Sequence, residues 1–226
     1  MNTPVVVDFP LKGEWVSPNT PGSKVPSHGT DILGARYAYD FVGIDPETRG
    51  RRYYRSSLLR YLTLGVELED FFGWGQPIFS ATAGTVVEVE DGQPERNPVH
   101  PLRDFSIRVK NARAFTSGEN KAYEMVAGNF VIVESNEGYV VYAHAQTGSI
   151  LVAVGESVVT GQRLAKVDHS GNSTAPHLHF QLMDDADPWK AQGIPCCFRE
   201  YEIFQDGSWH VVQNSIPKIT DRIRKR

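Results

Sequence analysis

The sequence contains few cysteines and no long apolar run, and both absences narrow the classes of protein it can belong to. Only two of its 226 residues are cysteines, the adjacent Cys196 and Cys197. Adjacent cysteines rarely form a disulfide, because the bond requires a specific geometry, and two thiols alone cannot complete a tetrahedral zinc site. No segment approaches the roughly 18 apolar residues of a membrane-spanning helix, and residues 1–8 lack the pattern of a secretory signal. We therefore expect no disulfide framework and no membrane span, and we interpret the two cysteines as packing residues.

Basic residues are also too few and too scattered to favour a nucleic-acid partner. Lys and Arg number 23 against 27 Asp and Glu, which gives a formal net charge of -4. Binding to nucleic acid requires clustered Lys and Arg that neutralise phosphates. Such a cluster occurs only at residues 218–226, which we interpret as a solvated terminus. We expect no nucleic-acid partner.

Long helical patterns are missing as well, whereas β-favouring segments are frequent. No heptad repeat or long amphipathic pattern is present. From residue 76 onward, short apolar segments are separated by turn residues about every 8–12 positions, which is typical of antiparallel β proteins. The sequence predicts a mainly β fold with an antiparallel sheet, sandwich or barrel-like body. Within it we expect a strand over residues 105–110 and irregular structure over residues 111–127.

Composition divides the chain into three expected parts. Residues 1–26 contain five prolines and should form a loop-rich N-terminal arm with one or two short strands. Residues 27–188 should form the main domain, interrupted by an insertion at residues 44–73 that carries a short helix. Residues 189–226 are expected to be a C-terminal extension.

Two predicted strands carry polar side chains suited to chemistry. Residues 177–182 alternate strictly, so that His177, His179 and Gln181 share one face and three apolar residues share the other. The two imidazoles should stand about 7 Å apart along the strand. A strand over residues 36–43 should place Asp40 on one face with Ala38 and Val42, opposite three aromatic side chains. A His-x-His pair alone is a weak sign of a metal site, since two surface histidines on an edge strand have the same pattern.

Four segments taken together are far more specific. They are Ser27-His28-Gly29 with residues 37–41, residues 75–86, residues 128–133 with Tyr142-Ala143-His144, and residues 155–180. In order and spacing they resemble the lysostaphin-type, or LytM-like, zinc metalloendopeptidases that cut peptidoglycan. The resemblance extends over residues 27–185 and implies the duplicated hybrid motif fold of that family.

The resemblance also implies roles for individual residues. It implies that His28, Asp40 and His179 bind zinc and that His144 and His177 form the catalytic pair. Two imidazoles and one carboxylate leave a coordination position for water, as in catalytic zinc sites. The sequence departs from the better-known members because eleven residues separate His28 from Asp40, and Asp31 lies nearer to His28. We favour Asp40 over Asp31, because residues 37–41 match one branch of the family and alternation gives Asp40 the required face.

The implied function is hydrolysis of peptide bonds in peptidoglycan peptides by a monomeric enzyme, and two alternatives stay open. One is a non-catalytic member of the same fold that binds wall fragments or another enzyme. The other is a carrier domain, because residues 149–166 resemble half of a biotinyl or lipoyl domain; the turn at residues 155–156 lacks the lysine that carriers modify.

The expected location and one further histidine complete the predictions. The implied substrate lies in the cell envelope or outside the cell, yet no export signal is visible. A mis-assigned start, unconventional export or a different peptide substrate would each explain this. His169, which precedes a glycine- and serine-containing loop, is expected to be a turn residue or to line the entrance of the cleft.

Overall fold

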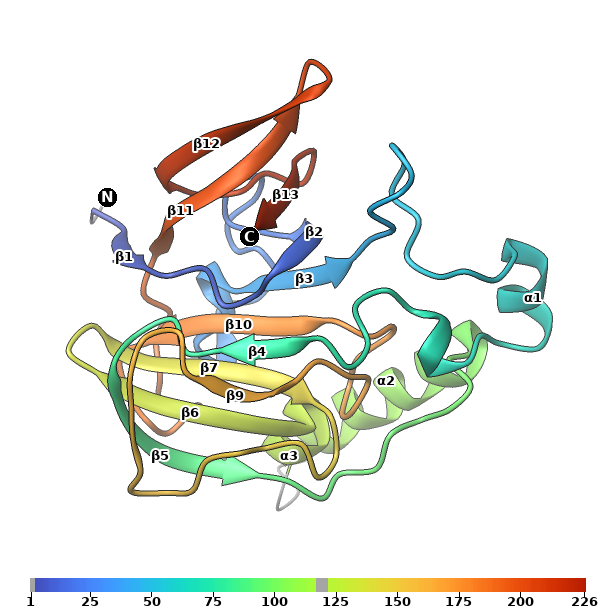
Figure 1. Ribbon diagram of the computed structural model, residues 1–226. Coiled ribbons are helices and arrows are strands. Elements are labelled where there is room, and N and C mark those ends of the chain that lie inside the picture. Colours follow the sequence, from blue (N-terminus) through green and yellow to red (C-terminus); the bar gives the residue numbers. More distant parts are fainter. Residues whose placement is uncertain (1–2, 117–121) are drawn as a thin grey trace.

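A computed structural model describes residues 3–116 and 122–226, and most of its regular structure is β (Figure 1). One sheet holds eleven strands in the order β1-β11-β13-β2-β3-β10-β7-β6-β5-β8, with β12 paired to β11. All of its pairings are antiparallel except that of β1 with β11. Two short strands, β4 and β9, pair separately. The prediction of a mainly β, antiparallel fold is confirmed.

The strands have the following bounds: β1 Val5–Val7, β2 Gly13–Asn19, β3 Tyr39–Gly43, β4 Pro77–Phe79, β5 Gly84–Glu90, β6 Asn129–Ser135, β7 Gly138–Ala145, β8 Ser157–Val158, β9 Arg163–Lys166, β10 Leu178–Met183, β11 Cys196–Gln205, β12 Ser208–Ser215 and β13 Arg222–Lys225. Residues 1–26 thus contribute β1 and β2, and residues 189–226 contribute β11 to β13. In Figure 1 these strands lie together in the upper part of the molecule, next to β3.

The main core lies on one face of the central strands. Tyr39 and Phe41 of β3 and Phe180 of β10 are fully buried there, together with Tyr142 of β7 and Phe198 of β11. Neighbouring rings in this group meet at centroid distances of 5.1 to 6.3 Å, which are favourable separations for aromatic pairs. Because side chains alternate along a strand, this anchoring turns the intervening polar residues of β3 and β10 to the opposite face.

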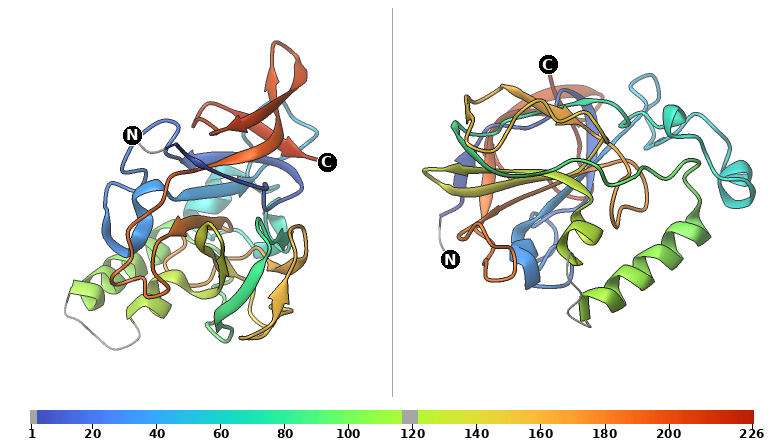
Figure 2. Two further views of the ribbon diagram at one scale, coloured as in Figure 1. Left: turned by 90° about the vertical axis from the view of Figure 1, so that its left-hand side faces the viewer. Right: turned by 90° about the horizontal axis from the view of Figure 1, so that it is seen from below.

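The helices are α1 Leu58–Thr63, α2 Pro101–Thr116 and α3 Ala122–Ala127, with 3-10 turns η1 Ile32–Tyr37 and η2 Leu68–Asp70. The short helix expected within residues 44–73 is confirmed as α1. In Figure 2, α2 and α3 lie to one side of the strands. No helix among the described residues is both long enough and apolar enough to cross a bilayer.

The predictions for residues 105–110 and 111–127 are wrong. Residues 105–110 belong to α2, which continues to Thr116, and α3 occupies residues 122–127; residues 117–121 lie outside the described part. The alternation of residues 105–110 imitates a strand, but none of these side chains is buried, so they form no core face. Helix signals lie just upstream instead. Pro101 occupies the first helical position, where its missing N–H costs nothing, and the Asp104 carboxylate accepts the backbone N–H of His100 at 2.8 Å.

Candidate metal centre

The pairing of β3 with β10 brings the first two candidate ligands together. The antiparallel register sets His179 directly opposite Asp40, so both side chains project from the same face of the sheet. Nδ1 of His179 lies 3.0 Å from Oδ1 of Asp40. The other ring nitrogen of His179 lies 3.0 Å from Oε1 of Gln181, whose amide nitrogen in turn donates to the carbonyl of Leu33 at 2.7 Å. Gln181 therefore holds the His179 ring with Nδ1 turned towards Asp40.

His28 reaches the same carboxylate from the loop between β2 and η1. The backbone of Ser27 is tied to the carbonyl of Arg36 at 3.0 Å, which closes this loop against η1. Nδ1 of His28 lies 3.0 Å from the Ser27 hydroxyl, and Nε2 lies 3.0 Å from Oδ2 of Asp40. One ligand atom from each of His28, Asp40 and His179 lies within 4.8 Å of the others.

The two remaining candidate histidines border this cluster. Nε2 of His177 lies 3.4 Å from Oδ1 of Asp40. The ring of His144, at the end of β7, lies 4.6 Å from that of His177 and 6.0 Å from that of His179, measured between centroids. His144 also has a φ of 64°, a left-handed backbone conformation that costs a non-glycine residue about 1–3 kcal/mol and is concentrated at functional sites. The structure thus brings all five sequence-predicted residues together.

Burial and charge set different protonation preferences within the cluster. Burial alone would raise the pKa of Asp40, but the neighbouring imidazoles of His177, His179 and His28 outweigh it and lower that pKa well below its usual value. Burial, reinforced by the charges of His177 and His179, lowers the pKa of His144 well below its usual value. Burial also acts to lower the pKa of His177, but the Asp40 carboxylate and the Ala175 carbonyl make the net shift upward.

A cavity of about 460 Å³, here called the histidine cavity, opens onto these side chains. All five histidine and aspartate candidates line it. Part of its wall is apolar, with Ile32 and Leu33 of η1 and Val126 of α3. Arg108 of α2 is the one Lys or Arg among its described lining residues. The arrangement therefore combines three candidate metal ligands, two further imidazoles and an open cavity.

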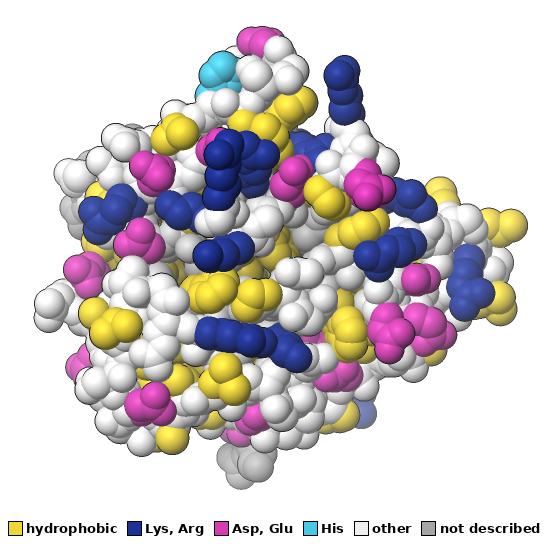
Figure 3. Space-filling view, viewed as in Figure 1, with side chains coloured by type: hydrophobic (Ala, Val, Ile, Leu, Met, Phe, Trp, Pro, Cys, Tyr) yellow, Lys and Arg dark blue, Asp and Glu magenta, His cyan; other side chains and the backbone are white. Residues whose placement is uncertain are grey.

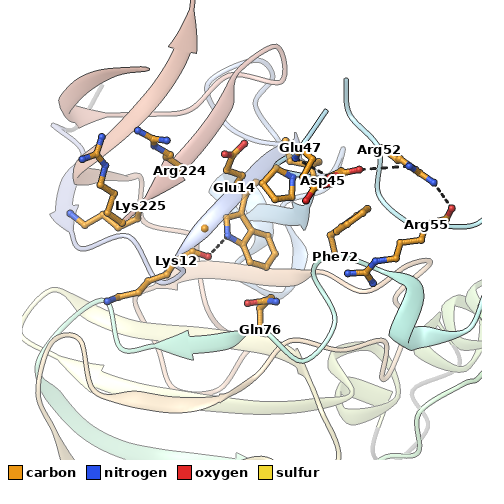
Figure 4. Close-up of a pocket in the computed structure, with 15 residues that line it drawn as sticks. Lys12, Glu14, Asp45, Glu47, Arg52, Arg55, Phe72, Gln76, Arg224 and Lys225 are labelled. Carbon is orange, nitrogen blue, oxygen red and sulfur yellow. Dashed lines mark hydrogen bonds and ion pairs between the residues drawn. The ribbon is translucent and has the colours of Figure 1, made fainter. Parts of the chain in front are cut away.

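A larger hollow of about 800 Å³ shares no lining residue with the histidine cavity (Figure 4). Trp15 of β2 contributes to its wall, which also carries basic and acidic side chains. Arg52 and Asp45, for example, lie 3.7 Å apart. On the face drawn in Figure 3, basic and acidic side chains are likewise interspersed. No histidine is among the described residues that line this hollow, so the five candidate site residues all lie at the histidine cavity.

The donor set fits a zinc ion. Imidazole nitrogen and carboxylate oxygen are common zinc ligands, and three protein ligands with one open position are typical of catalytic zinc sites. The competing carboxylate of Asp31 is exposed and accepts two hydrogen bonds of 2.7 Å from Arg36, outside the cluster. Asp40 also has a supporting donor that the sequence did not reveal, since Nδ2 of Asn19 donates to its Oδ2 at 2.6 Å.

A second group missed at the sequence level lies behind His177. The expectation that His169 lines the entrance is wrong, because its side chain is fully buried and lies 3.2 Å from the Asp104 carboxylate. His169 precedes the turn at residues 171–172 and is not part of it. Arg96 bonds to Asp104 and to the carbonyl oxygens of Gly171 and Ser173. These residues are distant in sequence, and no local pattern identifies them as a group.

Comparisons with known proteins also indicate a similarity to peptidases. Residues 106–191 match peptidase family M23, which confirms the resemblance to lysostaphin-type and LytM-like peptidases. The matched stretch includes His144, His177 and His179, whereas His28 and Asp40 lie upstream of it.

The chain is also similar to individual relatives. It is 33% identical over 89 residues to the peptidoglycan DD-endopeptidase ShyB of Vibrio cholerae, covering 37% of this chain and 20% of the relative. To ShyA of the same organism it is 32% identical over 100 residues, covering 41% and 22%. The chain thus spans about a fifth of the length of these curated relatives. Superposed on the catalytic domain of lysostaphin from Staphylococcus simulans, it has 19% identity and a TM-score of 0.37, covering 80% of this chain and 88% of that one.

Proposed function

We propose that this chain, which matches peptidase family M23 over residues 106–191, is a zinc-dependent endopeptidase that hydrolyses peptide bonds in peptidoglycan. The observation that carries the proposal is the convergence of His28, Asp40 and His179 within 4.8 Å on the wall of the histidine cavity. Three segments far apart in sequence meet there, and two imidazoles that are outside the ligand set lie beside them.

In this proposal, Nε2 of His28, the carboxylate of Asp40 and Nδ1 of His179 hold the ion. A zinc ion in such a site supplies Lewis-acid activation of a water molecule and of the scissile carbonyl. The protein contributes orientation. Ser27 and Gln181 each contact the ring nitrogen of a candidate ligand that points away from Asp40, and partners of this kind fix the tautomer of a metal-binding histidine.

His144 and His177 are proposed to handle protons and to bind the developing oxyanion. Burial keeps His144 neutral, whereas the Asp40 carboxylate lets His177 retain its proton to higher pH. A neutral imidazole can accept a proton or donate its single N–H, and a charged one can donate from both nitrogens. One imidazole of the pair thus favours its neutral form and the other its protonated form, a combination that suits general acid–base hydrolysis.

The substrate class rests on the relatives and on the cavity. The relatives that match this chain are named peptidoglycan DD-endopeptidases, and we extend that substrate, and with it a place of action in the cell envelope, to this chain. The apolar part of the wall, including Leu33 and Val126, suits the short side chains of a stem peptide, and Arg108 can pair with a peptide carboxylate.

The test combines metal analysis with a digest of cross-linked peptidoglycan. The purified chain should contain about one zinc per molecule, and the released fragments, read by mass spectrometry, should include newly cleaved cross-links. A chelator should abolish cleavage, and added zinc should restore it. Zinc at normal stoichiometry without any cleavage would instead indicate a non-catalytic binding module of the same fold.

A further inference from the structure

A buried chain of polar groups connects the start of α2 to the back of His177. The side chains of Asp104 and His169 are fully buried and meet at 3.2 Å between Oδ2 and Nε2. The other ring nitrogen of His169 lies 3.0 Å from the hydroxyl of Ser173. That hydroxyl lies 3.0 Å from Nδ1 of His177. Four side chains are thus joined in series from a buried carboxylate to a candidate catalytic imidazole.

The number of available protons determines which groups in this series donate hydrogen bonds and which accept them. Burial lowers the pKa of His169 to about 4, so its ring is neutral near pH 7 and carries one N–H. Nε2 of His169 lies 3.2 Å from the Asp104 carboxylate and 3.3 Å from the Arg96 guanidinium. The Ser173 hydroxyl donates its proton to the carbonyl of Ala175 at 2.6 Å. Because Ser173 has no second proton, it can only accept from His177.

These hydrogen bonds determine which nitrogen of the His177 ring carries a proton. Its Nδ1 must carry a proton, which is shared between the Ser173 hydroxyl at 3.0 Å and the carbonyl of Ala175 at 2.7 Å. The opposite nitrogen, Nε2, faces the histidine cavity and lies 3.4 Å from Asp40. The series therefore fixes the ring so that Nε2 is the nitrogen that works in the cavity.

We propose that Asp104 and His169 are positioning residues for His177, acting through Ser173. The catalytic consequence rests on the proposed peptidase function, whereas the orientation of the His177 ring does not. Arg96 supports the series from outside, since it bonds to Asp104 at 3.0 Å and to the backbone of Ser173 at 2.7 Å. Helix α2 thus places the Asp104 carboxylate next to His169, on the side of His177 that faces away from the cavity.

The test uses Ser173→Ala and a matched control, Ser170→Ala. Both serines are buried in the loop before β10, but the Ser170 hydroxyl bonds only to backbone, donating to the carbonyl of Ala145 and accepting the N–H of Asn129. Long-range proton–nitrogen correlation spectra of the full-length chain report which nitrogen of His177 is protonated and how fast its proton exchanges with water. We expect the wild type and Ser170→Ala to show a slowly exchanging proton on Nδ1 of His177.

In Ser173→Ala that proton should exchange about tenfold faster, the factor that corresponds to losing one hydrogen bond. His169→Leu should have the same effect, and His169→Asn, which keeps a polar group near Ser173, should lie closer to the wild type. An unchanged His177 signal in both Ser173→Ala and His169→Leu would overturn the proposal. An equal change in Ser170→Ala would overturn it too, because the effect would then belong to the loop as a whole.

Turnover measurements separate this proposal from the proposed function. If the chain is a peptidase, Ser173→Ala should lower kcat about tenfold with KM unchanged, since the substrate does not touch Ser173. Suppose that the Nδ1 proton of His177 exchanges faster in Ser173→Ala but the wild type has no peptidase activity. That result would support the positioning series and remove the proposed function. Peptidase activity in the wild type with the same kcat in Ser173→Ala and His169→Leu would support the proposed function and remove the catalytic role of the positioning series.

Discussion

Replacing Asp40 by alanine should empty the metal centre, and this follows from where its carboxylate lies. Among the residues that the structure describes, Asp40 supplies the one carboxylate of the cluster, and it lies 3.0 Å from both His28 and His179. Its oxygen also accepts the amide of Asn19 at 2.6 Å. Without it, the two imidazoles lose the charge that balances a divalent ion and the group that holds them at ligand distance from each other.

The size of the effect can be bounded. Removing a partner behind a ligand typically weakens metal binding about 10- to 100-fold, so loss of a direct ligand should exceed about 100-fold. At a free zinc concentration 100 times the wild-type Kd, bound zinc stabilises the fold by about 2.7 kcal/mol. A 100-fold weaker variant keeps about 0.4 kcal/mol of this. For a chain of this length, the lost 2.3 kcal/mol corresponds to about 5–9 °C in Tm.

The assay is a pair of thermal unfolding curves, with and without zinc, supported by elemental analysis. Asp31→Ala is the matched control, because Asp31 is an exposed aspartate of the neighbouring loop that pairs with Arg36. An exposed pair of this kind is worth about 0–1 kcal/mol, so Asp31→Ala should keep the zinc-dependent rise in Tm. A full zinc response in Asp40→Ala together with its loss in Asp31→Ala would refute the assignment.

Three further outcomes are expected. His144→Ala and His177→Ala should each retain zinc but lose at least about 100-fold in turnover, the lower range for general acid–base groups; wild-type rates in either would remove it from the catalytic pair. Burial raises the pKa of Asp168 to about 7, so its contribution to stability is lost as pH rises from about 4 through about 7. Asp168→Asn should therefore unfold at a higher temperature than the wild type at pH 8 and match it at pH 4; equal curves at both would contradict the burial effect. Gly84→Ala should lose about 1–3 kcal/mol, because a Cβ there would lie 2.0 Å from a backbone carbonyl of β6, whereas Gly92→Ala, with nothing within 4 Å, should be neutral in urea unfolding.

Alternation predicted well the two strands that carry the candidate ligands, β3 and β10. In β10 the apolar residues Leu178 and Phe180 enter the core, and this leaves the intervening His179 on the cavity face. The same rule turned Asp40 away from the aromatic side of β3. Local periodicity is enough here because each strand has one face in the core and one face on the cavity.

The parts that the sequence predicts poorly depend on contacts between distant segments. Residues 105–110 alternate like a strand but lie in α2, whose start is fixed by Pro101 and by the hydrogen bond that the backbone N–H of His100 donates to Asp104. His169 gives no local sign of its burial, because its partner Asp104 lies 65 positions upstream. Asn19 is similarly remote from Asp40 in sequence and meets it only because β2 pairs with β3.

The most direct measurement of the central claim is an X-ray absorption spectrum at the zinc edge of the purified chain. Our account predicts a shell of nitrogen and oxygen ligands at about 2.0–2.2 Å, with two imidazoles and no sulfur, and loss of that shell in Asp40→Ala. A sulfur shell near 2.3 Å, or an imidazole shell that persists unchanged in Asp40→Ala, would contradict it.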